Sequence, residues 1–340
     1  MEIKVSIPAH PNGADARIQP VNDPAADDLR LDALQYVELR RMVKQQGLLD
    51  RQPLYYSIKI PFTVGLVAAS IAFLVSVDSV WLQLLNAAFL GVVFTQLAFI
   101  GHDAGHQEIF SSVKRNDLIG LMICLLMGAW VPSWWHDKHN QRHHSDPNRI
   151  GVDGDIDVSL FAFAIGRASS ISFLFAGIHY VLTGRPVKYS LTEPLLVVAH
   201  LMAYFALLFF LLEPLHAVLF IAVHQVIEGL YMGLVFAPNH KGMPVLDGDT
   251  PMSFLRQQVT TARDVSAHPI TDFVYGGLNY QIEHHLFPSM PRNNLKRAQP
   301  LVREFCRARS IPYHETSLMQ SHWEILGYMH SLPPLRKKRA

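Results

Sequence analysis

The chain has 340 residues, of which 50% are hydrophobic and only 17% are charged, whereas soluble domains carry about 25% charged residues. A formal net charge of +1 argues against nucleic-acid binding, and the apolar excess argues against a disordered chain or an ordinary soluble enzyme. The two cysteines, Cys124 and Cys306, exclude a disulfide framework and a cysteine-based zinc or iron–sulfur site, whereas histidine is abundant at 18 residues.

Residues 1–60 form the N-terminal region, which precedes the first long apolar stretch. Residues 1–27 are rich in Pro, Gly, Asp and Ala, and we expect them to be disordered. Residues 28–60 are expected to form an amphipathic cytoplasmic helix, over 28–46, and a lead-in to the membrane. The apolar residues on one side of this helix are Leu31, Leu34 and Val37. The chain opens without a charged segment followed by a cleavable apolar stretch, so no signal peptide is expected.

Four stretches approach the length of about 20 apolar residues that a helix needs to cross a bilayer. They are residues 61–77, 80–100, 195–212 and 215–236. Two residues separate the first pair and two separate the second pair, which predicts two helical hairpins with short turns on one membrane side. Neither the stretches nor the turns contain lysine or arginine, so the positive-inside rule places both chain termini in the cytoplasm.

These features predict an all-α integral membrane protein with four transmembrane helices in two hairpins and a cytoplasmic helical cap. Residues 61–300 are expected to form the membrane and catalytic domain, and residues 301–340 a cytoplasmic C-terminal segment. The apolar stretches 118–130 and 158–182 are too short or too polar for confident spans, so we expect interfacial or buried helices there.

Seven histidines stand in three clusters on the predicted cytoplasmic side, and an eighth follows the fourth span. They are His102 and His106; His139, His143 and His144; His284 and His285; and His240. In a helix, the i, i+4 spacing puts His102 and His106 on one face, and the same spacing relates His139 to His143. Gln281 precedes His284 and His285 by three and four residues, again one helical face.

Clustered imidazoles cannot all be charged at close range, nor can they all be buried without partners. Neutral imidazoles that converge on metal ions meet both conditions. Seven or eight nitrogens exceed the four ligands of a tetrahedral zinc, so two metal ions are expected in the cytoplasmic cap. Imidazole suits iron, copper, zinc and nickel, so the ligand type alone does not name the metal.

Carboxylates near the clusters are expected to accept hydrogen bonds from the remaining imidazole N–H groups and so orient the rings. Asp103 is the preferred candidate because it lies inside the first cluster. The other candidates are Asp137, Asp146, Asp153, Asp155, Asp157 and Glu283.

The three clusters resemble the histidine boxes of membrane fatty acyl desaturases. The matching segments are His102-Asp103-Ala104-Gly105-His106, the run from Trp134 to Asn148, and the run from Gly277 to Pro288. Gln281, at the head of the third box, is similar to the front-end branch, which includes delta-5, delta-6 and sphingolipid desaturases. Three residues separate His139 from His143 where front-end enzymes usually have two, a spacing found among bacterial and plant members. The resemblance covers about residues 60–300.

This resemblance implies an enzyme that uses O2 to introduce a cis double bond into a fatty acyl lipid or an acyl-CoA. It implies two iron ions held by His102, His106, His139, His143, His144, His240, His284 and His285. Gln281 could bind metal, hold a water molecule or only orient a neighbour. The stretch before the first span is too short for a fused cytochrome b5 domain, so we expect a separate donor, either ferredoxin or cytochrome b5 with its reductase. A prokaryotic plasma membrane is the expected location, or the ER membrane in a eukaryote.

A long acyl chain also needs a narrow apolar tunnel below the metals. The candidate wall residues are Trp130, Trp134, Trp135, Tyr231 and Phe236, although the tryptophans would equally suit an interfacial belt. The closest alternative reaction is hydroxylation, epoxidation or ketolase-type oxidation of a lipid on the same scaffold. A more remote alternative is a metal-binding transporter or sensor, which would need polar ligands along several spans.

Overall fold

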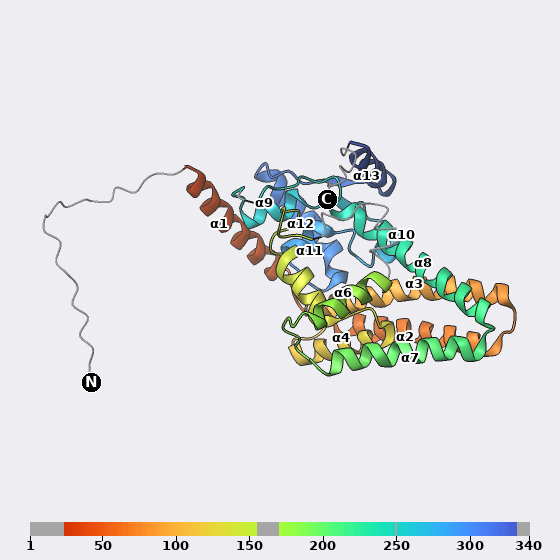
Figure 1. Ribbon diagram of the computed structural model, residues 1–340. Coiled ribbons are helices and arrows are strands. Elements are labelled where there is room, and N and C mark those ends of the chain that lie inside the picture. The colour runs from red at the N-terminus through yellow and green to blue at the C-terminus, as the bar shows by residue number, and fades with distance from the viewer. Residues whose placement is uncertain (1–23, 155–169, 249, 332–340) are drawn as a thin grey trace, which may run out of the picture.

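A computed structural model describes residues 24–154, 170–248 and 250–331 of the chain (Figure 1). Over these ranges the chain is mainly helical, and the short strands β1 (Asp264–Val265) and β2 (Glu315–Thr316) form one parallel pair. Residues 1–23 of the segment 1–27, which we expected to be disordered, lie outside the described residues. The candidate carboxylates Asp155 and Asp157 also lie outside them.

Helix α1 (Pro24–Gln45) agrees with the predicted N-terminal helix, and the apolar residues expected on one side of it are not the ones that it buries. Leu31, Leu34 and Val37 are each more than half exposed, whereas Leu39 and Val43 are fully buried. Asp32 is buried on the same face as Leu39 and Val43, against which α9 (Phe254–Thr260) and α12 (Arg292–Ala308) pack. The carboxylate of Asp32 accepts hydrogen bonds from Ser253 and Arg256, so the three exposed residues lie on a different face of α1.

Four helices are long and apolar enough to cross a membrane, which confirms that part of the predicted fold. They are α2 (Pro53–Ser76), α3 (Val80–Gly105), α7 (Thr192–Leu211) and α8 (Pro214–His240). Figure 1 shows the α2–α3 and α7–α8 connections at the same end of the molecule. The helices α3 and α8 extend five and four residues beyond the predicted spans, and these extra turns carry His102 and His240.

Helix α2 begins eight residues earlier than the apolar stretch that predicted it. Pro53 occupies the first turn, where the N–H that proline lacks would have no partner within the helix, and Pro61 is accommodated inside the helix. The hydropathy pattern marks only the apolar part of a helix, so it missed this polar first portion. As a result, Lys59 lies within α2 although the predicted span contained no basic residue.

Helix α3 is the centre of the long-helix layer. In its most apolar segment 72% of the residues are buried, compared with 22% in α2, 39% in α8 and 11% in α7. Gly91 lets α3 and α8 approach closely, because a Cβ at this position would lie 2.8 Å from the backbone oxygen of His224. The close packing of these two helices fixes where their histidine-bearing ends lie.

Between the two pairs of long helices, the chain makes a sharp bend. Helix α4 (Val113–Met127) corresponds to the predicted buried or interfacial stretch 118–130, and it meets the segment Pro132–His143 at 114°. This segment contains α5 (Pro132–Trp135) and the π-helix η1 (His136–His143). Helix α6 (Ser170–Leu182) covers the described part of the predicted stretch 158–182.

The C-terminal helices gather at the end of the long helices opposite to the two short connections (Figure 1). They are α9 (Phe254–Thr260), α10 (Pro269–Val274), α11 (Gln281–Leu286), α12 (Arg292–Ala308) and α13 (Leu318–Ser331). A second apolar core, formed with α1, includes Leu39, Leu255, Ile282 and Val302. This core holds α11 against the ends of α3 and α8.

Candidate metal centre

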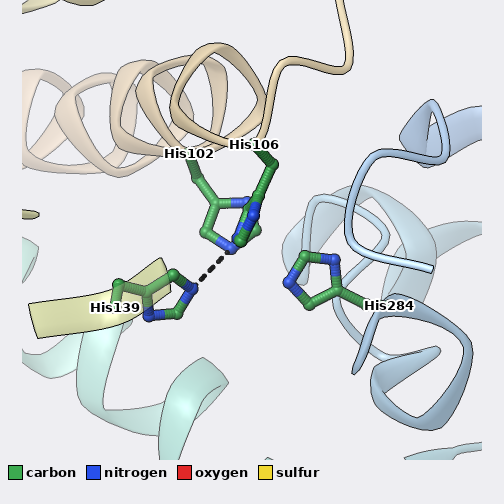
Figure 2. Close-up of side chains that lie close together, drawn as sticks. All are labelled: His102, His106, His139 and His284. Atoms are coloured by element: carbon green, nitrogen blue, oxygen red, sulfur yellow. Dashed lines mark hydrogen bonds between the residues drawn. The ribbon is translucent and has the colours of Figure 1, made fainter. Parts of the chain in front are cut away.

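Three elements that are far apart in the sequence bring four of the predicted histidines together. The end of α3 supplies His102 and His106, η1 supplies His139, and α11 supplies His284, and each of these four residues offers a nitrogen within 4.8 Å of the others. Figure 2 shows these side chains pointing toward one another from the three elements. We call this set the four-histidine group.

A second set lies beside the first. It consists of His143 from η1, His240 from the end of α8 and His285 from α11, whose nitrogens also lie within 4.8 Å of one another. We call it the three-histidine group. His144 lies between the two groups, since its ring centroid is 4.5 Å from that of His106 and 4.3 Å from that of His285.

The π-helix explains which side chains of the second histidine cluster lie close together. The backbone N–H of His144 donates to the carbonyl oxygen of His139 at 2.9 Å, and the Nε2 atoms of these two residues are 3.2 Å apart. The predicted i, i+4 partner, His143, instead joins the three-histidine group. The rings of His139 and His143 still stack with centroids 5.1 Å apart, as a shared helix face predicts, and the π-helix adds His144 to the neighbours of His139.

Helix α11 divides its polar residues between the groups. His284 faces the four-histidine group, whereas His285 belongs to the three-histidine group. Gln281 also lies at the latter, with its side-chain amide nitrogen 3.0 Å from Nε2 of His240 and its oxygen accepting from Asn239 at 3.0 Å.

Each ring of the three-histidine group has an acceptor for its Nδ1–H. Nδ1 of His143 lies 3.0 Å from a carboxylate oxygen of Asp153. Nδ1 of His240 lies 3.0 Å from the carbonyl oxygen of Thr261, and Nδ1 of His285 lies 2.8 Å from the side-chain oxygen of Gln258. A proton held on Nδ1 leaves Nε2 as the lone-pair donor, the tautomer that a metal ligand requires.

Burial keeps these imidazoles neutral. It lowers the pKa of His139, His144 and His284 well below the usual value, and the neighbouring histidines lower each pKa further. The pKa of His285 is lowered in the same way. A neutral imidazole offers a lone pair to a metal ion without first losing a proton.

The donor set fits metal ions better than it fits a closed hydrogen-bond network. Among the described residues, Nε2 of His106, both ring nitrogens of His284 and Nε2 of His285 are buried without a hydrogen-bond partner. Buried polar atoms of this kind cost free energy unless something binds them. Nε2 of His139 has two other imidazole nitrogens at 3.2 Å, close to the about 3.4 Å expected between tetrahedral ligands at about 2.1 Å from one ion.

The carboxylates predicted to orient the rings differ in whether they contact a histidine. Asp153 contacts His143 directly, as described above. Asp103 lies 3.8 Å from Nδ1 of His102, and its close partner is Arg292 at 2.7 Å. The remaining described candidates make their closest contacts elsewhere: Asp137 with Arg142, Asp146 with Arg149, and Glu283 with Tyr313.

Sequence reasoning missed Gln258 and Thr261 of the α9 region and Arg292 of α12. Gln258 and Thr261 lie 19 and 16 residues before the third box, in a segment without a histidine motif. Arg292 lies only a few residues after that box, yet nothing in the sequence pairs it with Asp103, 189 positions earlier. Only the tertiary contacts reveal these three positions.

A cavity of about 740 Å³ opens beside the histidines. It reaches His106 and His144 at one end, and its lining includes Trp130 and Trp135. Of the predicted wall residues, these two line it, whereas Trp134, Tyr231 and Phe236 do not. Trp135 packs so tightly on the first box that a Cβ at Gly105 would lie 2.0 Å from its ring.

Comparison with known proteins identifies the family. The family model described as fatty acid desaturase matches residues 79–317, which include all eight clustered histidines. The chain belongs to this family. It therefore carries the three histidine boxes of a fatty acid desaturase, now assembled into the two groups described above.

Three relatives illustrate the similarity. The chain is 29% identical to the acyl-lipid (9-3)-desaturase of Physcomitrium patens over 85% of its own length and 61% of the moss protein. It is 28% identical to the Delta(6)-fatty-acid desaturase fat-3 of Caenorhabditis elegans, over 88% and 74% of the two chains. It is 31% identical to the Delta(8)-fatty-acid desaturase of Euglena gracilis, over 81% and 73%. The chain thus spans about three fifths of the moss relative's length.

Proposed function

We propose that this family member is an oxygen-dependent fatty acyl desaturase that introduces a cis double bond at a di-iron centre. The observation that carries the proposal is the convergence of eight histidines as two groups with His144 between them. Two bound iron ions, with O2, would supply the oxidant for removing two hydrogens from an unactivated methylene. The relatives named as fatty acid desaturases support this reaction over hydroxylation, epoxidation or ketolase chemistry.

The residues that we propose as iron ligands are those of both groups together with His144. Gln281 lies beside His240, where its amide can bind the metal, hold a water molecule or orient that ring. The acceptors Asp153, Gln258 and Thr261 keep the three rings of the three-histidine group in one tautomer. The protein's contribution is thus a rigid set of neutral nitrogen ligands.

We propose that the 740 Å³ cavity holds the acyl chain. Its volume falls within the range of about 300–1,000 Å³ that is usual for small-molecule sites, and His106 and His144 border it. Trp130 and Trp135 supply an apolar wall that excludes water from the methylene groups. Lys188 and Tyr189 line the cavity as polar residues suited to the carrier end of an acyl lipid or an acyl-CoA.

We propose a multi-pass membrane placement in which α2, α3, α7 and α8 span the bilayer as two hairpins. The apolar residues exposed on these helices, such as Trp81, Phe210 and Leu215, support contact with lipid. The histidine-bearing ends and both termini then lie in the cytoplasm, most simply at a prokaryotic plasma membrane. An electron donor, ferredoxin or cytochrome b5 with its reductase, would reach the centre from that side.

The test is expression of the chain in a heterologous host, followed by gas chromatography–mass spectrometry of its fatty acids with location of double bonds. We expect a new cis-unsaturated fatty acid and about two iron ions per purified chain. A hydroxylated or epoxidised product would assign the alternative reaction on the same scaffold. Metal uptake into vesicles without oxygen consumption would favour a transporter and contradict the proposal.

A further inference from the structure

A second, smaller cavity lies between α2, α10 and α12. Its volume is about 250 Å³, and its lining includes Tyr55 and Lys59 of α2 together with Arg292 and Lys296 of α12. It shares no lining residue with the 740 Å³ cavity. It is therefore a different site from the one proposed for the acyl substrate.

Arg292 lines this cavity with hydrogen-bonding capacity that the protein does not use. Its side chain is only 5% exposed, and its Nη2 atom donates to Asp103 and to the backbone oxygen of Phe99. Its Nε and Nη1 atoms are buried without a hydrogen-bond partner among the described residues. The guanidinium thus brings a positive charge to the wall of the cavity, which favours an anionic ligand there.

The charges around Arg292 also favour an anion. Lys59 and Lys296 line the same cavity, and Asp272 is the one carboxylate among the lining residues, where it pairs with Lys296 at 2.9 Å. Arg292 is the first residue of α12, and the residue before it, Pro291, provides no side-chain cap. The partial positive charge of this helix start adds to the three cations.

The cavity continues into an apolar surface. Tyr55, Lys59 and Phe62 follow one face of α2 at positions i, i+4 and i+7, and Phe62 is 58% exposed. On the other side, Ile270 and Phe273 of α10 are also more than half exposed. A cationic cavity bordered by exposed apolar side chains matches a phospholipid, which joins a phosphate to hydrocarbon chains.

We propose that this cavity binds the phosphate of an anionic membrane phospholipid. Arg292, Lys59 and Lys296 supply the positive charges that attract the phosphate, and the amino groups of the two lysines donate to its oxygens. The hydrocarbon chains lie along Phe62 of α2 and Phe273 of α10. The proposal requires that the long helices lie in a membrane, but it does not require the desaturation reaction.

The test is native mass spectrometry of the purified, iron-loaded chain in detergent with added phosphatidylglycerol or phosphatidylcholine. We expect one phosphatidylglycerol to be retained with higher affinity than phosphatidylcholine. The Lys59→Gln/Lys296→Gln variant should weaken this binding about 25-fold, at about fivefold for each lysine. Lys114→Gln/Arg115→Gln, which removes two exposed cations from the start of α4, is the matched control and should bind normally.

Two further measurements make the result decisive. The exposed Lys296→Gln alone should weaken binding about fivefold while the unliganded melting temperature stays unchanged, which separates lost binding from lost folding. Equal retention of the two lipids, or unaltered binding in both lysine variants, would overturn the proposal. Stabilisation by glycerol phosphate alone, equal to that by phosphatidylglycerol, would also overturn it, because the site would then take a soluble phosphate.

Discussion

The Nε2 atoms of His139 and His144 lie 3.2 Å apart, although an α-helix would direct these residues, five positions apart, to different sides. The π-helix η1 removes that difference by widening the turn, and the N–H of His144 reaches the carbonyl of His139. π-Helical turns are rare and occur frequently at functional sites. This one places His139 in the four-histidine group and His143 in the three-histidine group, so a single element supplies both.

Removal of a proposed ligand should abolish product and release metal. We expect His106→Ala or His284→Ala to yield no new unsaturated fatty acid, because each side chain belongs to the four-histidine group. Bound iron should fall from about two ions per chain to about one. The matched control is His330→Ala, an exposed histidine of α13 that belongs to neither histidine group. Unchanged fatty-acid profiles in cells that express either ligand variant would refute the site assignment.

Gln258 should act as a positioning residue through His285. Gln258→Leu removes the acceptor that lies 2.8 Å from Nδ1 of His285, which frees the ring to change tautomer. We expect iron affinity, measured by competition with a chelator, to fall about 10–100-fold. Gln258→Glu keeps an acceptor for Nδ1 of His285 on a side chain of the same length, so it should retain most of the iron affinity. Equal losses in both variants would indicate that Gln258 acts only in packing.

Gly105 should be required for the packing of the first histidine box. In Gly105→Ala the new Cβ would lie 2.0 Å from the Trp135 ring, so the ring or the end of α3 must move. We expect a stability loss of about 1–3 kcal/mol in thermal or denaturant unfolding, despite the higher helix propensity of alanine. Trp135→Phe, which shortens the ring, should restore part of this loss in the double variant. An unaltered melting temperature for Gly105→Ala would contradict the close contact.

Gly120 offers a way to shorten the proposed acyl cavity without disturbing the metal centre. It lines the 740 Å³ cavity, and a Cβ there meets only Pro132 at 3.9 Å. We expect Gly120→Phe to lower the conversion of long acyl chains more than that of short ones, as measured by gas chromatography of the products. Iron content should be unchanged, and Gly120→Ala should behave as the parent chain. A uniform loss at every chain length would argue against this cavity as the acyl site.

Local patterns in the sequence determined the main features of this protein. Apolar stretches of near-membrane length predicted the four long helices, because helix length and hydropathy are properties of contiguous residues. The spacing of His102 and His106 placed both side chains together, since α3 runs to Gly105, His106 is its C-terminal cap and the two ring centroids lie 4.5 Å apart. The repeated histidine clusters identified the family that the comparison confirms.

Only the tertiary structure decided how the histidines are divided between the two groups. The i, i+4 spacing predicted that His139 and His143 share a face, and their rings do stack, but these two residues belong to different groups. The π-helix η1 also brings His144 to His139, which the α-helical spacing did not predict. The contacts of Gln258 with His285 and of Arg292 with Asp103 join residues far apart in the chain. No local pattern encodes such contacts, because they exist only once α9, α11 and α12 pack against the end of α3.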